Sequence, residues 1–199
     1  MTKRGIAFLI ALAAFASILI RVWINMQEGD AFGDALWKMY RYFTIWTITV
    51  TGFVAAMIAL GRRVPASVQS GLLLSIGAVA IVFHVLLAHL TELQGLEIFV
   101  DFLFHTGVPI AWALFWLFFS PKSGLRLGQI PSWLVFPLAY CVYALMRGAM
   151  DGTYPYFFLN LDKQGIAGVA VYSVGLFLAF ALAGALIVGV GRLLNRFTG

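Results

Sequence analysis

Six long runs of apolar residues limit what this chain can fold into. Of its 199 residues, 62% are hydrophobic and 11% are charged, against roughly 25% charged residues in a soluble globular domain. Each run is long enough to cross roughly 30 Å of hydrocarbon at 1.5 Å per residue. We therefore expect an all-α integral membrane protein, a single bundle of six transmembrane helices that forms one domain over residues 1–199. The predicted spans are about Gly5–Ile24, Trp37–Leu60, Val68–Leu90, Ile98–Phe119, Trp133–Met150 and Gly165–Leu194.

The charged residues separate into two groups along this pattern. The N-terminus, the loops after the second and fourth runs and the C-terminal end carry eight of the thirteen Lys and Arg residues and no acid. All eight Asp and Glu residues lie at the opposite ends of the runs. The positive-inside rule then places both termini in the cytoplasm, as six crossings require. The net charge of +5 is explained by topology, so we expect no nucleic-acid partner.

The first run and the single cysteine exclude two other interpretations. The run follows Lys3 and Arg4, as in a signal peptide, but it is longer than a usual apolar signal region and no small-residue cleavage site follows it. We expect it to be retained as a helix. Cys141 is the one cysteine, so the chain can form no internal disulfide.

The stretch DFLFHTGVP, Asp101–Pro109, places an ionisable side chain inside the fourth run. His105 is that residue, and an intramembrane histidine is a candidate functional group. Asp101 precedes it by four positions, so a helix presents both on one face, where the carboxylate can orient the imidazole. Pro109 removes the N–H that the His105 carbonyl would accept from, which predicts a local break. The alternative is a histidine bonded to a neighbouring helix beside an ordinary membrane proline.

Threonines at helical spacing begin the second run. Thr44, Thr47 and Thr51 share one face of a helix. Thr44 and His105 are both predicted roughly 6–12 Å below the outer boundary, so the two side chains can meet. With His105 as base and Asp101 as orienting acid, Thr44 would be an activated nucleophile. The alternative is that the threonine hydroxyls bond backbone carbonyls of their own helix.

The remaining polar residues suggest no metal or cofactor. His84 and His89 are five positions apart, which does not put them on one helical face, and no Cys or His cluster has metal-ligand spacing. Phosphate-loop, dinucleotide and Gly-x-Ser-x-Gly signatures are absent. We therefore expect neither a metal nor a cofactor.

The outer loop 147–165 is rich in aromatic residues and begins with an arginine. Arg147 can hold a substrate carboxylate as a bidentate partner, or it can extend along the helix to water. Tyr154 is one of the aromatic residues expected at the outer interface, and Pro155 disfavours helix at that residue. We expect this loop to fold over the outer end of the bundle.

The sequence resembles bacterial relatives of the androgen-induced and androgen-dependent TFPI-regulating (ADTRP) membrane proteins. The likeness rests on YFT with Thr44, on FHTGVP with His105 and on RG…YPYFFLN with Arg147 and Asn160, in an order that covers essentially the whole chain. The resemblance implies a membrane hydrolase of esters between a fatty acid and a hydroxy fatty acid. It places the nucleophile on Thr44 and the base on His105. It also implies a bacterial cytoplasmic membrane, and the charge distribution places the site toward the extracytoplasmic leaflet.

Several roles stay open on the sequence alone. Thr47, Trp46 and Arg147 are candidates to stabilise the oxyanion, and Tyr154 and Asn160 are candidates to orient a long-chain acyl ester. Two functions other than hydrolysis also fit. One is a small transporter that uses His105, Asp101 and Arg147 as a proton or anion relay. The other is a non-catalytic membrane protein that associates with other helices through small residues.

Overall fold

The computed structural model describes residues 2–90 and 92–198, and every regular element within these ranges is a helix. Five helices are long and apolar enough to cross a membrane, and a bent pair of helices adds a sixth span if it is counted as one. The predicted all-helical class is therefore confirmed. The helices group into two compact units, Met1–Pro121 and Lys122–Gly199, which we call the N-terminal and C-terminal units. The single domain over residues 1–199 stays a prediction.

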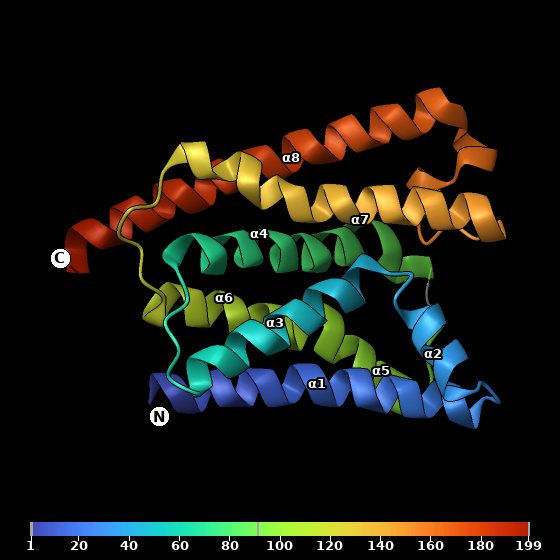
Figure 1. The fold of residues 1–199 in the computed structure, drawn as a ribbon, viewed down its shortest axis with the longest axis horizontal. Coiled ribbons are helices and arrows are strands. Elements are labelled where there is room, and N and C mark those ends of the chain that lie inside the picture. Colours follow the sequence, from blue (N-terminus) through green and yellow to red (C-terminus); the bar gives the residue numbers. More distant parts are fainter. Residues whose placement is uncertain (1, 91, 199) are drawn as a thin grey trace. The chain divides into compact units, whose positions relative to one another are not determined.

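The N-terminal unit is built on close packing between its first long helix and the helices that follow. Helix α1 (Lys3–Gln27) packs along α3 (Phe43–Ala59), and α4 (Ala66–Val82) packs against α3 and α6 (Val108–Phe119) (Figure 1). A Cβ atom on Gly52 would lie 2.9 Å from Cζ of Phe15, so α1 and α3 approach as closely as they do because residue 52 has no side chain. Small residues at such contacts are typical of membrane helix pairs.

The predicted second span, Trp37–Leu60, is not one continuous helix. Helix α2 (Phe32–Met39) and α3 are bent by 100° at the intervening residues, as their different directions in Figure 1 show. The Trp46 indole N–H donates to the backbone carbonyl of Tyr40 over 2.9 Å, which satisfies a carbonyl left at the end of α2. Apolar composition alone could not predict this bend. As a result Thr44 is the second residue of a helix rather than a residue further inside one.

Two membrane helices of this unit change to π-helix partway along. Helix α4 continues as the π-helical segment η1 (Phe83–Leu87), and α5 (Leu96–Phe102) reaches α6 through the π-helical segment η3 (Leu103–Gly107). At the end of η3 the Val108 N–H donates to the Leu103 carbonyl, five residues back. The break expected near Pro109 thus takes the form of a π-helical segment. Such segments occur frequently at functional sites.

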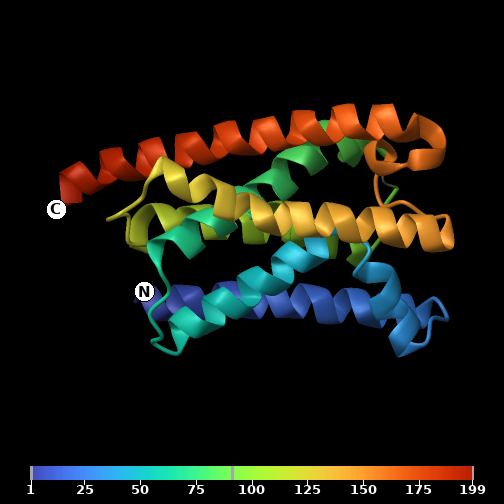
Figure 2. The same cartoon turned by 45° about the horizontal axis from the view of Figure 1, so that its top comes forward.

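The C-terminal unit consists mainly of two long helices. Helix α7 (Ile130–Asp151) ends at Gly152, which has the left-handed φ of 70° that glycine adopts readily at a helix end. Helix α8 (Leu161–Thr198) packs along α7 (Figure 2) and is interrupted at Gly165, whose φ is 64° and ψ 174°. The predicted spans Trp133–Met150 and Gly165–Leu194 lie within these two helices. The shorter elements of this unit are η4 (Leu127–Gln129) and η5 (Phe157–Leu159), and η2 (Ala88–Leu90) is a short element of the N-terminal unit.

Candidate functional site

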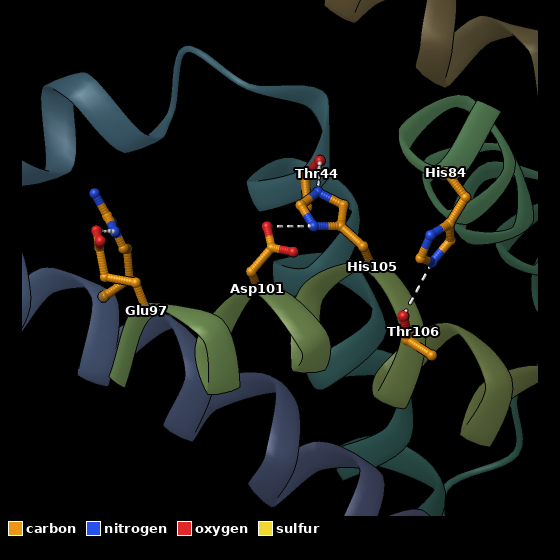
Figure 3. A network of polar contacts seen from close by, with 7 residues as sticks. Thr44, His84, Glu97, Asp101, His105 and Thr106 are labelled. Carbon is orange, nitrogen blue, oxygen red and sulfur yellow. Dashed lines mark hydrogen bonds and ion pairs between the residues drawn. The ribbon is translucent and has the colours of Figure 1, made fainter. Parts of the chain in front are cut away.

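Three polar side chains that are separated in sequence meet in the N-terminal unit (Figure 3). The hydroxyl Oγ1 of Thr44 lies 3.3 Å from Nε2 of His105. On the other side of the same ring, Nδ1 lies 2.9 Å from Oδ1 of Asp101. The side chains of His105 and Asp101 are 13% and 22% exposed, so the contact is shielded but not sealed. A hydroxyl, an imidazole and a carboxylate thus lie in the order that a nucleophile, a base and an orienting acid require.

The contact between His105 and Asp101 is close but not well aligned. The two atoms lie within ion-pair distance, yet the ring N–H direction does not meet the angular limits of a hydrogen bond, and Nδ1 has no other partner among the described residues. Catalytic hydrogen bonds are often poorly aligned until substrate binds, so this distance suits an orienting acid. A carboxylate beside Nδ1 favours the tautomer with its proton there, which leaves Nε2 as an acceptor for the Thr44 hydroxyl.

The local structure explains how each group reaches this place. Asp101 lies in the last turn of α5, and His105 follows four residues later within η3. Thr44 lies in the first turn of α3, immediately after the bend. Backbone N–H groups at this end of a helix have no partner within it, and the helix dipole is positive there. Negative charge that develops beside Thr44 is therefore favoured by the helix itself.

Two residues of η1, Phe83 and His84, contact His105 and its neighbour Thr106 in η3. The Phe83 ring is stacked on the His105 ring, with centroids 3.7 Å apart and planes inclined by 7°. The next residue, His84, places Nε2 3.0 Å from Oγ1 of Thr106. Helical spacing of His84 and His89 argued only against a metal site. The sequence does not predict a role in the site for Phe83 or Thr106, because packing between helices is not visible in it.

Thr47 differs from the other threonines of α3. The hydroxyls of Thr49 and Thr51 donate to the carbonyls four residues back, over 2.7 and 2.8 Å, as membrane threonines commonly do. Thr47 is 0% exposed, and within the described part of the chain its Oγ1 has no hydrogen-bond partner. A buried hydroxyl without a partner is unfavourable, which makes Thr47 a candidate to donate a hydrogen bond to a bound group. It lies one turn along from Thr44 on the same face.

The predicted role of Trp46 competes with a structural one. Its indole N–H donates to the Tyr40 carbonyl at the bend between α2 and α3. Because the indole has a single N–H, this bond occupies the donor that an oxyanion would need. Trp46 is therefore a weaker candidate than Thr47 for that task.

Three predicted site residues belong to the C-terminal unit and have contacts there. Arg147 is 3% exposed and donates to the Tyr143 hydroxyl over 2.7 Å, with Nε 3.7 Å from Oδ2 of Asp151. Its guanidinium is thus buried and does not extend to solvent. The ring of Tyr154 covers Gly148 so closely that a Cβ on the glycine would lie 2.2 Å from it.

Asn160 also has a local role in this unit. Its Oδ1 accepts a hydrogen bond of 3.0 Å from the Lys163 N–H, which caps the start of α8. The roles of Arg147, Tyr154 and Asn160 in binding a substrate stay predictions.

The described residues include no group of three or more His, Cys, Asp or Glu side chains that could hold a metal ion. No protein-family model, curated protein or solved structure matches this chain in comparisons with each of them. The case for function therefore rests on the geometry of Thr44, His105 and Asp101 and on the residues around them.

Proposed function

We propose that this protein is an intramembrane hydrolase of lipid esters, with Thr44 as nucleophile and His105 as base. The observation that carries the proposal is the placement of His105 between two partners, 3.3 Å from the Thr44 hydroxyl and 2.9 Å from the Asp101 carboxylate. A threonine hydroxyl is a weak nucleophile until a base removes its proton, and a second group must hold that base in the right orientation. The contact of Thr44 with His105 supports the first condition, and the contact of His105 with Asp101 supports the second.

The first half of the reaction transfers the acyl group to the protein. Oγ1 of Thr44 attacks the ester carbonyl carbon while Nε2 of His105 takes the hydroxyl proton. The bond between the carbonyl carbon and the alcohol oxygen then breaks. His105 gives its proton to that oxygen, so the free alcohol leaves and an acyl-threonine ester remains. Asp101 stabilises the imidazolium that forms between these steps.

The second half restores Thr44. Nε2 of His105 takes a proton from water, and the water oxygen attacks the acyl carbon. The bond from that carbon to Oγ1 of Thr44 breaks, the proton returns to Oγ1, and a free carboxylic acid leaves. No metal or redox partner enters this balance.

Thr47 is our candidate donor to the oxyanion that forms in both halves. Its hydroxyl is fully buried and lacks a partner among residues 2–90 and 92–198, and it lies one helical turn from Thr44. Preorganised donors at the developing charge are usually the largest single contribution to such catalysis. The positive end of the α3 dipole acts in the same direction.

The substrate class follows from the apolar surroundings. Apart from the threonines of α3, helices α3 and α6 are almost wholly apolar, so an ester with long acyl chains can reach the site from the bilayer. We propose esters between a fatty acid and a hydroxy fatty acid, in agreement with the resemblance described for the sequence.

The proposed topology has six spans, with α2 and α3 forming one broken span, and both termini in the cytoplasm of a bacterial cell. Thr44 and His105 then lie in the extracytoplasmic leaflet of the cytoplasmic membrane. The distribution of Lys and Arg supports this orientation. Single cysteines at Arg62 and at Asp151, introduced into a Cys141→Ser background, should react with an impermeant maleimide only from the cytoplasmic and the outer side, respectively.

The decisive experiment is covalent labelling of the protein in detergent with a fluorophosphonate probe. We expect a single adduct, mapped by mass spectrometry to Thr44. Thr44→Val and His105→Ala should abolish it, while Thr44→Ser should retain it. Thr51→Val is the matched control, because it removes a hydroxyl from the same face of α3 that bonds only backbone.

The proposal fails if the parent protein is not labelled and does not release fatty acid from hydroxy-fatty-acid esters. It also fails if the adduct maps to Thr106 and persists in Thr44→Val, because the other Thr–His contact would then be the reactive one.

A second candidate function is transport, and one observation favours it. Transporters often bind their substrates at interrupted helices, and here α2–α3, η1 and η3 all interrupt membrane helices. In proteoliposomes a transporter would move protons or anions across the bilayer in a manner that requires His105 but tolerates Thr44→Val. The hydrolase should show no such flux.

A further inference from the structure

We infer that η1 positions the base of this site, with the Phe83 ring as a platform for His105 and the His84–Thr106 hydrogen bond as the contact that holds the platform in place. This inference rests on the proposed function, because it assigns His84, Phe83 and Thr106 as positioning residues for His105. None of the three needs to touch the substrate.

The geometry consists of two matched contacts between neighbouring residues. Phe83 stacks on His105 at 3.7 Å between centroids, and His84 meets Thr106 at 3.0 Å. Two consecutive residues of η1 thus contact two consecutive residues of η3. Sliding one segment along the other would break both contacts together, so the hydrogen bond fixes the register at which the rings face each other.

The Phe83 ring restrains the His105 ring in a direction in which its two polar partners do not. Thr44 and Asp101 approach the edge of the ring, at Nε2 and Nδ1. Neither opposes tilting of the ring out of its own plane. Phe83 is 7% exposed and parallel to the imidazole within 7°, so it opposes that motion on one face. An aromatic face also favours the cationic imidazolium that forms when Thr44 loses its proton.

The π-helical form of both segments suits this role. A π-helical segment inserts an extra residue into the turn and redirects the side chains near it. Here each of the two contacts joins one π-helical segment to the other. The device therefore depends on both irregular segments, and a regular helix in either place would change which residues face His105.

The activity test compares variants that remove or keep each contact. Thr106→Val and His84→Leu remove the hydrogen bond, and Phe83→Leu removes the aromatic face while keeping an apolar side chain. We expect each to lower kcat by about 10- to 100-fold with KM nearly unchanged, since a displacement of about 1 Å in a reacting group can lower a rate by about 100-fold. His84→Gln and Thr106→Ser keep a polar partner and should restore most of the rate.

A double variant separates one shared contact from two independent effects. His84→Leu combined with Thr106→Val should be no slower than either single variant, because both remove the same hydrogen bond. Losses that multiply would overturn the assignment of His84 and Thr106 to one contact.

A second measurement does not depend on activity. The chain has three histidines, so ring-labelled histidine gives a simple NMR spectrum in nanodiscs. Protons that lie over an aromatic face are shielded, so the carbon-bound protons of the His105 ring should resonate upfield of those of His89. Phe83→Leu should abolish this shift, Thr106→Val should reduce it, and Thr106→Ser should keep it.

The two measurements distinguish failure of this inference from failure of the proposed function. A parent protein without esterase activity but with the predicted shifts would retain the η1 contact and reject the hydrolase. An active parent in which Thr106→Val changes neither kcat nor the His105 resonances would retain the hydrolase and overturn the positioning role.

Discussion

Among the described residues of the N-terminal unit, two contacts join a threonine to a histidine, and they differ in what surrounds them (Figure 3). Thr44 and His105 are 3.3 Å apart, and His84 and Thr106 are 3.0 Å apart. His105 has a carboxylate beside its second nitrogen and an aromatic ring on its face. In the part of the chain that the structure describes, no carboxylate is paired with His84, which is exposed.

For the proposed function, the longer of these two contacts is the stronger candidate. Among the described residues the shorter contact lacks an orienting acid, so no carboxylate there fixes its tautomer or stabilises an imidazolium. The longer contact has both, and its threonine lies in the first turn of a helix, where the dipole favours negative charge. We therefore expect the surrounding groups, rather than the distance between threonine and histidine, to decide which threonine reacts.

Exchanging each histidine for glutamine should give the largest contrast. Glutamine keeps a polar group near the position of Nε2 but cannot take a proton, so His105→Gln should lower kcat/KM by roughly 10³–10⁴-fold. His84→Gln should stay within about threefold of the parent, because it keeps the hydrogen bond to Thr106. Steady-state hydrolysis of a hydroxy-fatty-acid ester measures both. Equal losses in the two variants would show that the histidines share one role.

Asp101→Asn should have the next largest effect. The asparagine has similar shape but no charge, so it neither stabilises the imidazolium nor fixes the tautomer, and we expect kcat to fall roughly 10²–10³-fold. Asp30→Asn is the control, since that acid pairs with Lys38 rather than with a histidine. Pre-steady-state acylation rates give the measurement. An Asp101→Asn variant as fast as the parent would show that His105 acts as a base without help from Asp101.

Sequence reasoning succeeded where a single helix carries the information. Asp101 and His105 are four apart, so helical spacing predicts that they share a face, and the structure places their side-chain atoms 2.9 Å apart. The apolar runs likewise predicted the all-helical class. The meeting of Thr44 with His105 depends on which helix faces pack together, and a depth estimate made for a straight second span could not show that.

The contacts of Phe83 and Trp46 join separate helices, and they leave no periodic pattern in the sequence. Phe83 is one of 18 phenylalanines, and nothing in its neighbours distinguishes it from a core residue. The partner of Trp46 is a carbonyl exposed only because α2 ends at Met39. Such interactions depend on how helices pack and where they stop, which the apolar pattern of the sequence does not show.

A carboxylate placed beside His84 should partly convert the second contact into the first. Ala80 precedes His84 by four residues, as Asp101 precedes His105. In a Thr44→Val background, Ala80→Asp should produce slow fluorophosphonate labelling of Thr106, below about one hundredth of the parent rate, since orientation supplies only part of the effect of a general base. Peptide mapping identifies the residue. Ala80→Asn is the control, and labelling there would show that charge is not what the second contact lacks.

The smallest effect is expected one turn before Asp101. Glu97 pairs with Arg21 of α1 over 2.5 Å, and the two side chains are 26% and 29% exposed, so the pair ties the start of α5 to α1 at modest strength. Glu97→Gln should lower the free energy of unfolding by no more than about 1 kcal/mol and turnover by less than about fivefold. Charge reversal of both partners, Arg21→Glu with Glu97→Arg, should restore the parent values. A loss in Glu97→Gln as large as that of Asp101→Asn would mean that the Glu97 charge acts on His105 as well, and the orienting acid would then be a pair of carboxylates on successive turns.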